Sequence, residues 1–222
     1  MGNLISIPDL FKRSWALYKE GFWFFAKLMG FNLLAFLCMV PAGLLLALAT
    51  ATNRFYAIAF ALIIFLTVLL AVIVVCLGLH IAMLLSIKDR NFVGTIKDYF
   101  NWSKPLVWPY AWVSVLTGLV IMAGFILFIV PGIIFAVWFG LAKYAAILDG
   151  KKGAEALKYS KSLVKGNFWP VLGRIALLVA MAMILSSISS VGFMINLFFT
   201  APFAMIYVYL MYEDLKRLKG AI

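Results

Sequence analysis

Few side chains in the apolar parts of this chain could do chemistry. His80 is the only histidine, and no acidic residue stands near it in the sequence. A transition-metal site usually needs several ligands, and a Ser–His pair would need an orienting group and an oxyanion hole. We therefore expect no metal, no cofactor and no catalytic residue. His80 is then either a hydrogen-bonded packing residue or, with Asn32 and Asn196, part of a polar interior.

No carboxylate lies deep in any of the apolar runs. Proton- and sodium-coupled transporters commonly hold an Asp or Glu near the middle of the bilayer, and none lies deep in a run here. The remaining possibilities are an uncoupled flux, coupling through backbone carbonyls, or no transport at all. The same scarcity argues against an enzyme that works inside the membrane.

Composition indicates which elements must carry these residues. Of 222 residues, 66% are hydrophobic and only 12% are charged, whereas soluble domains are about half apolar and about a quarter charged. The apolar residues form runs long enough to cross a bilayer as helices. The runs cover about 22–49, 55–87, 105–149 and 168–212. The last two are each long enough for two spans, with turns expected at 128–132 and 186–192.

The sequence thus predicts an all-α fold: a single transmembrane domain over residues 1–222, a helix bundle of about six spans. The net charge is +11. With six spans, 18 of the 19 basic residues fall on one side of the membrane, and only Arg54, between the first and second runs, falls on the other. Because Lys and Arg stay cytoplasmic in short loops, we expect a multi-pass protein of the cell inner (plasma) membrane with both termini in the cytoplasm. No nucleic-acid motif accompanies the charge, so nucleic acid is not an expected partner.

A pattern recurs where spans begin. Ser14-x-x-Leu17-x-Lys19-x-x-Phe22-Trp23 opens the first span, Ser160-x-x-Leu163-x-Lys165-x-x-Phe168-Trp169 opens the fifth, and Trp102-x-Lys104-x-x-Val107-Trp108 opens the third more weakly. Apolar residues at helical spacing precede each one, which is typical of helices lying in the membrane interface. We expect three repeats of an interfacial amphipathic helix plus a transmembrane hairpin, over about 7–88, 90–149 and 151–219.

Two roles fit these span entrances. Trp and Lys mark the headgroup level of a bilayer, so the segments are either interfacial anchors without a ligand or basic entrances that grip anionic phospholipid headgroups or the acidic face of a membrane partner. Arg174, about one turn inside the fifth span, either snorkels to the interface or offers its fork to a lipid phosphate. The candidate residues are Lys19, Trp23, Lys104, Trp108, Lys165, Trp169 and Arg174.

The second half of the chain resembles a broad prokaryotic family of integral membrane proteins. The similarity rests on Pro131-Gly132-Ile133-Ile134, Ala145-Ala146-Ile147-Leu148-Asp149-Gly150, the segment from Ala156 to Trp169, and the ending Tyr212-Glu213-Asp214-Leu215-Lys216-Arg217. The family is similar to the membrane domain attached to some glycerophosphoryl diester phosphodiesterases. This chain lacks their soluble phosphodiesterase domain, so the resemblance implies a membrane domain near phospholipid metabolism and supplies no catalytic residue.

The sequence therefore favours a non-catalytic membrane protein that engages anionic phospholipid or a membrane partner through a basic cytoplasmic face. A small transporter, channel or lipid-translocating protein is the alternative. A cavity lined by His80, Asn32 or Asn196 would support that alternative, and a solid apolar core would count against it.

Overall fold

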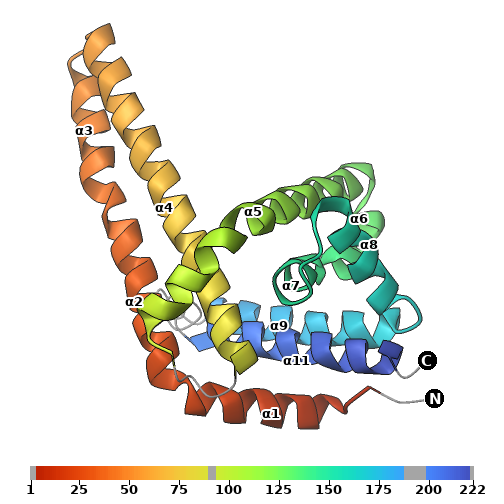
Figure 1. Ribbon diagram of the computed structural model, residues 1–222. Coiled ribbons are helices and arrows are strands. Elements are labelled where there is room, and N and C mark those ends of the chain that lie inside the picture. Colours follow the sequence, from red (N-terminus) through yellow and green to blue (C-terminus); the bar gives the residue numbers. More distant parts are fainter. Residues whose placement is uncertain (1–3, 90–93, 188–198, 221–222) are drawn as a thin grey trace.

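The protein is all-α, as predicted (Figure 1). The computed structural model describes residues 4–89, 94–187 and 199–220, and no strand occurs among them. The helices are α1 (Ile7–Glu20), α2 (Phe22–Leu37), α3 (Met39–Ala51), α4 (Phe55–Asp89), α5 (Ile96–Leu127), α6 (Ile129–Phe139), α7 (Ala142–Leu148), α8 (Gly153–Val164), α9 (Phe168–Ser187) and α11 (Ala201–Gly220).

Five segments of the described residues are long and apolar enough to cross a membrane. They are Phe22–Ala51, Phe55–Asp89, Ile96–Leu127, Ile129–Leu148 and Phe168–Ser187. The chain is therefore a multi-pass membrane protein. The sixth span remains a prediction. The first two residues of its expected turn, 186–192, belong to α9, residues 188–198 lie outside the described part, and α11 by itself is not among the five segments.

The first hairpin joins α2 and α3 to α4 and projects away from the other helices (Figure 1). The outgoing helix of this hairpin breaks at Cys38, between α2 and α3. The cause of the break is Pro41, which lacks an N–H and whose ring would clash with the carbonyl of Leu37 in a continuous helix. The return to α4 is made by the short loop Thr52–Arg54, where Asn53 takes a positive φ of 52°.

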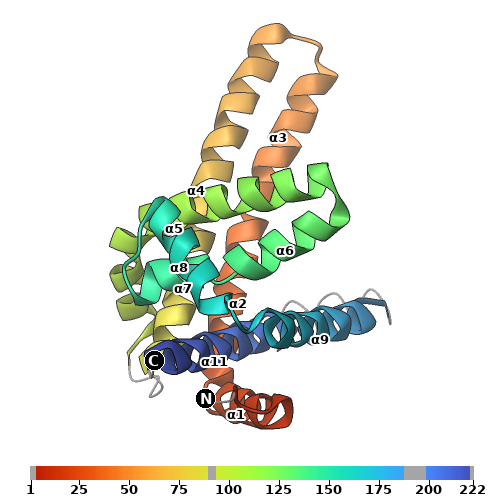
Figure 2. The same cartoon turned by 90° about the vertical axis from the view of Figure 1, so that its right-hand side faces the viewer.

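The second hairpin pairs α5 with α6 at close range (Figure 2). Its turn falls within the expected segment, at Phe128, which is extended between the two helices. The helices approach at Gly124 and Gly132. A Cβ atom added at Gly124 would lie 3.0 Å from the Cα atom of Gly132, and one added at Gly132 would lie 2.4 Å from the ring of Phe125. Glycine is required here because two backbones meet.

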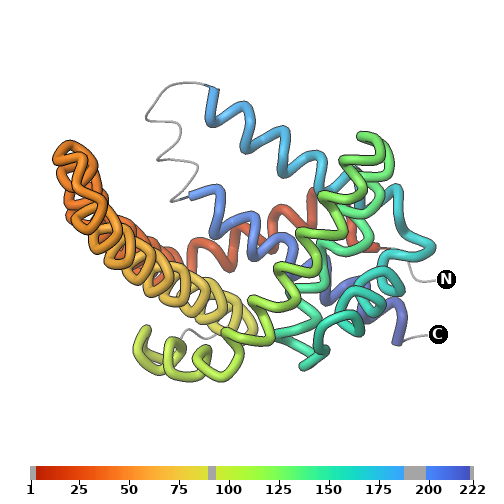
Figure 3. Tube along the Cα trace, turned by 90° about the horizontal axis from the view of Figure 1, so that it is seen from above, coloured from red at the N-terminus to blue at the C-terminus, as the bar shows by residue number. Residues whose placement is uncertain are grey.

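The third pair, α9 and α11, is held differently. Seen from above, α9 lies apart from α11 (Figure 3), and the two make little direct contact in the described residues. Helix α1 passes below both (Figures 1 and 2). Its Phe11, Trp15 and Tyr18 rings pack around Phe203 of α11. Helix α1, which belongs to the first predicted repeat, therefore packs against α11 of the third repeat.

The core centres on α11. Half of its residues are buried, including Tyr207, Tyr209 and Tyr212, and it contacts α1, α4 and α8. The helices of the first hairpin cross α9 and α11 in both side views and do not run parallel to them (Figures 1 and 2). The arrangement is a set of splayed hairpins around one buried helix.

The middle repeat differs from the expected pattern. Helices α1 and α8 are separate from the spans that follow them, but α5 runs without a break from Ile96 to Leu127. Pro105 and Pro109 lie inside it. Of the expected middle amphipathic segment, Phe92 and Val93 lie outside the described residues, and Ile96, Tyr99 and Phe100 belong to α5 itself. The described residues therefore hold no separate interfacial helix before the third span.

Candidate functional site: a basic entrance face and an interior pocket

The first and fifth spans begin in the same way. Helix α2 starts at Phe22 and α9 starts at Phe168, which are the matching Phe residues of the repeated pattern. The tryptophan that follows is the second residue of each helix: Trp23 is 74% exposed and Trp169 is 77% exposed. Trp108 is also 79% exposed, although it lies inside α5. Each tryptophan therefore turns outward, as an interfacial anchor would.

The lysines of the three entrances are exposed too. Lys19 ends α1, Lys165 follows α8, and Lys104 lies in α5 with its ammonium 5.9 Å from the centroid of the Phe100 ring. None of them forms an ion pair among the described residues. No ring contact or hydrogen bond of the described part joins one Lys–Trp pair to another. The structure thus presents three separate basic entrances.

Most of the acidic side chains are bonded within the protein, whereas Glu20, beside Lys19, is exposed and has no bonded partner in the described residues. Asp149, at the start of the α7–α8 connection, accepts hydrogen bonds from the Tyr212 hydroxyl and the Lys216 ammonium of α11. This brings together two motifs on which the family resemblance rests. Asp89 accepts from the hydroxyl of Tyr99, and Asp98 closes a capping box with Thr95. These carboxylates stabilise the fold and leave much of the surface charge positive.

Arg174 is placed apart from the exposed entrances. Its side chain is buried, at 5% exposure. One guanidinium nitrogen donates to the carbonyl of Pro170 at 3.1 Å and another donates to the carbonyl of Ile5 at 2.6 Å. The Ile5 N–H in turn donates to Asp214 at 2.8 Å, and Arg217 pairs with the same carboxylate at 2.6 Å. Of the two roles considered for Arg174, snorkelling to the interface or binding a lipid phosphate, the structure shows neither: its guanidinium donates to backbone carbonyls, in a clamp that ties the N-terminal segment to α9 and α11.

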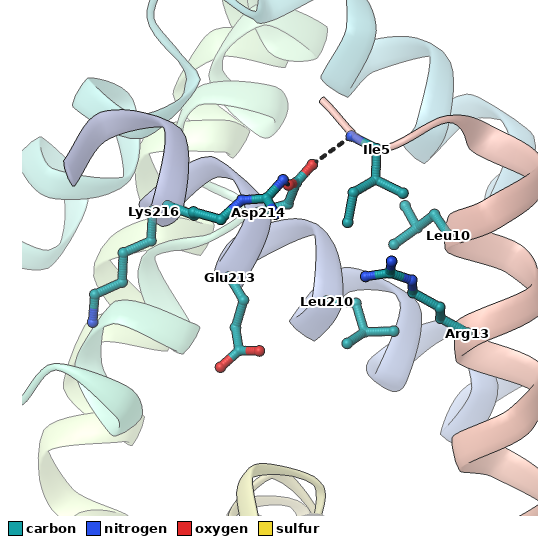
Figure 4. Close-up of a pocket in the computed structure, with 8 residues that line it drawn as sticks. Ile5, Leu10, Arg13, Leu210, Glu213, Asp214 and Lys216 are labelled. Atoms are coloured by element: carbon teal, nitrogen blue, oxygen red, sulfur yellow. Dashed lines mark hydrogen bonds and ion pairs between the residues drawn. The ribbon is translucent and has the colours of Figure 1, made fainter. Parts of the chain in front are cut away.

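A pocket of about 470 Å³ opens beside this clamp (Figure 4). Its walls carry bases and acids together: Ile5, Leu10, Arg13, Leu210, Glu213, Asp214, Lys216 and Arg217. Figure 4 shows Arg13 extending from α1 toward Leu210. Lys216 and Arg217 each pair with a carboxylate, whereas Arg13 has no ion pair in the described part. The mixed charge of the walls selects neither anions nor cations.

A second pocket, of about 410 Å³, brings two of the predicted interior residues together. It is lined by Met29, Asn32, Leu33 and Phe36 of α2, by Ile73, Cys76, Leu77 and His80 of α4, and by Tyr110 and Ala201. His80 is exposed into this space, and its ring lies 5.7 Å from the ring of Tyr110. Asn196 lies outside the described residues. We call this space the α2–α4 pocket.

Sequence reasoning missed Tyr110 as a member of this pocket. It sits inside α5, and its signal was only a Tyr following Pro109 in an apolar helix. Within the described residues, no three His, Cys, Asp or Glu side chains come together as a metal site would require. Both cysteines are free: Cys38 is exposed on the first hairpin, and Cys76 is half-buried in the pocket wall.

No family model, curated protein or solved structure matches this chain. The resemblance to the phosphodiesterase-linked membrane domains therefore stays a prediction from the motifs.

Proposed function

We propose that this protein is a non-catalytic multi-pass protein of the cell inner membrane, with both termini in the cytoplasm, that engages anionic phospholipid or a membrane partner through its basic entrance face. The basic entrance face is defined by Lys19, Trp23, Lys104, Trp108, Lys165 and Trp169. The single observation that carries the proposal is the contrast between free lysines and mostly occupied carboxylates in the described residues.

That contrast has a direct electrostatic consequence. Of the entrance residues, Lys19, Lys104 and Lys165 have no carboxylate partner, while Asp149 and Asp214 are each bonded to residues of the fold. Each Lys or Arg near an anionic membrane surface contributes about 1 kcal/mol of attraction. The unpaired lysines are thus available to acidic headgroups without breaking an internal ion pair.

The exposed tryptophans support the same reading. Trp rings prefer the headgroup level because one edge is polar and the body is apolar. Trp23 and Trp169 stand four residues after Lys19 and Lys165, so ammonium and ring are held at the start of a span. The family resemblance, with its link to phospholipid metabolism, is in keeping with a lipid ligand.

The test is lipid enrichment. The protein is inserted in nanodiscs of mixed phosphatidylglycerol and phosphatidylcholine, and the lipids retained on mild extraction are counted by native mass spectrometry. The triple variant K19A/K104A/K165A is expected to lose at least about fivefold of the preference for phosphatidylglycerol, because the loss of a single lysine's contribution, about 1 kcal/mol, already corresponds to that factor.

A matched control distinguishes an effect of the entrance positions from an effect of total surface charge. The triple variant K12A/K97A/K158A removes three other exposed lysines that have no ion pair in the described part. It should lose much less of the preference. Equal losses in the two triples would reduce the proposal to general surface charge, and no loss in either would overturn it.

A small transporter, channel or lipid-translocating protein is the second candidate. The α2–α4 pocket favours it, because Asn32 and His80 meet in one space of about 410 Å³, the size of a small-molecule site. Efflux of a fluorescent anion and scrambling of labelled lipid are measured in proteoliposomes. Flux above that of empty vesicles, lost in H80A, would favour this candidate; none would remove it.

A further inference from the structure

The α2–α4 pocket has a polar end and an apolar end. Helices α2 and α4 run in opposite directions through the first hairpin, so positions near Phe22 on one face positions near Asp89 on the other. His80 is the lining residue of α4 nearest that end, and its ring lies beside Tyr110; on α2, Met29 lies nearest that end, Asn32 and Leu33 follow, and Phe36 lines the opposite end. An occupant that fits both ends is amphiphilic.

An unpaired positive charge stands behind the polar end. Lys143 of α7 is half-buried and forms neither a hydrogen bond nor an ion pair in the described residues. Lys143 is not among the residues that line the pocket, but its helix, α7, packs against α4 and α5, which carry the lining residues His80 and Tyr110. Basic side chains within membrane segments usually have partners or face a functional cavity. A bound anion in the pocket would compensate the charge of Lys143.

Helix length sets the depth of the pocket. The return loop Thr52–Arg54 is the outer end of the first hairpin in the topology proposed above. At 1.5 Å per residue, Asn32 lies about 28 Å from Ala51 and His80 about 38 Å from Phe55. The hydrocarbon core is about 30 Å thick, so His80 lies beyond its inner boundary and Asn32 lies close to that boundary, inside the core. Phe36 lies about 22 Å from Ala51 and stays within the hydrocarbon.

We propose that the α2–α4 pocket binds one anionic lipid of the inner leaflet. Its acidic headgroup lies among Asn32, His80 and the Tyr110 edge under the field of Lys143, and an acyl chain follows Leu33, Phe36 and Ile73. Depth, polarity and charge each select this occupant: a zwitterionic lipid would leave Lys143 uncompensated, and a soluble anion would leave the apolar end empty. This site rests on the proposed function but uses different residues from the basic entrance face.

Cys76 provides a reporter inside the pocket, and Cys38 is a matched control outside it. The protein is purified in a neutral detergent, and alkylation by N-ethylmaleimide is followed by mass spectrometry in the C38S variant. Lysophosphatidylglycerol at ten times its dissociation constant should slow alkylation of Cys76 about tenfold, by simple mass action. Lysophosphatidylcholine and glycerol 3-phosphate at the same concentrations should slow it little, and Cys38 in the C76S variant should react at one rate throughout.

Charge at position 143 is then varied. Lys143→Met in the C38S background should abolish the protection of Cys76, and Lys143→Arg should retain it, which also shows that the altered chain still folds. Lys27→Met removes an exposed lysine of α2 that does not line the pocket and should leave protection intact. Protection by lysophosphatidylcholine equal to that by lysophosphatidylglycerol, or protection that survives in Lys143→Met, would overturn the site.

The two proposals can fail independently. The K19A/K104A/K165A variant should lose bulk enrichment of phosphatidylglycerol and keep the protection of Cys76. Protection without bulk enrichment would overturn the basic entrance face and support the pocket. Bulk enrichment without protection would overturn the pocket alone.

Discussion

A single carboxylate, Asp149, joins the middle of the chain to its end. It accepts hydrogen bonds from Tyr212, which is 1% exposed, and from Lys216. Removing one partner from a buried hydrogen bond costs more than the bond itself contributes, because the other partner keeps its desolvation penalty. If Asp149 loses its carboxylate, the buried Tyr212 hydroxyl is left without its acceptor.

Asp149→Ala is therefore expected to lower the free energy of unfolding by about 1–3 kcal/mol. The measurement is unfolding in mixed micelles of SDS and a mild detergent. Glu155→Ala is the control, because Glu155 pairs with Lys151 at 2.7 Å on the exposed surface and surface pairs contribute little. Equal destabilisation by the two variants would contradict the role given to Asp149.

The same carboxylate predicts a pH dependence. The hydrogen bond to Asp149 raises the pKa of Lys216 above its ordinary value of 10.5. A folded-state pKa above the unfolded one adds stability that is full below pH 10.5 and is lost as the pH rises through the folded pKa. Lys216→Met should thus be less stable than the parent below pH 10.5, and the difference should shrink above it. A difference that stays constant across that pH would contradict the pairing.

Among the elements, the α5–α6 hairpin depends on two small residues. At Gly124 an added methyl group would meet the Cα atom of Gly132 at 3.0 Å and the ring of Phe135 at 2.8 Å. Backbone cannot move aside as a long side chain can, so overpacking must separate the helices.

Gly124→Ala should cost about 1–3 kcal/mol of stability by overpacking. Gly118→Ala is its partner experiment in the same helix, since nothing lies within 4 Å of the added methyl group there, and alanine forms helix better than glycine by about 1 kcal/mol. In detergent unfolding, Gly124→Ala is expected to lower the free energy of unfolding and Gly118→Ala to raise it. Similar losses in the two variants would show that the close approach of Gly124 and Gly132 does not restrict the residue at position 124.

Helix α9 is tied to the N-terminal segment through Arg174. Its guanidinium holds the Ile5 carbonyl at 2.6 Å, and the Ile5 N–H is held by Asp214. Arg174→Met should release this segment, so amide exchange at residues 4–9 should become faster while exchange in α5 stays the same. Unchanged protection at Ile5 would show that Asp214 alone is enough.

For the whole molecule, the orientation in the membrane follows from the distribution of charge. Arg54 is the one basic residue predicted on the outer side, and Lys152 is among those predicted inside. In a chain with both native cysteines replaced by serine, Arg54→Cys should react with an impermeant maleimide added to intact cells, and Lys152→Cys should react only after lysis. The reverse pattern would invert the topology and remove the inner-leaflet site with it.

The sequence by itself determined the all-α class and the apolar helices long enough to cross a membrane. These depend on a local property, because long apolar runs require helices in lipid. Proline alone did not decide where helices break: the helix is interrupted before Pro41, but α5 continues through Pro105 and Pro109. The continuity of α5 was not predicted, because an amphipathic pattern leading into a span does not say whether the helix breaks between them.

Only the tertiary structure decided which helix faces meet. Arg174 and Ile5 are 169 residues apart, and Tyr212 and Asp149 are 63 apart. Nothing in the sequence pattern paired Asn32 and His80 with Tyr110 in one pocket. The physical reason is that lipid is as apolar as the side chains, so hydrophobic periodicity does not distinguish a lipid-facing surface from a packed one. Helix contacts are chosen by small residues and polar bonds, which become visible only once the chain is folded.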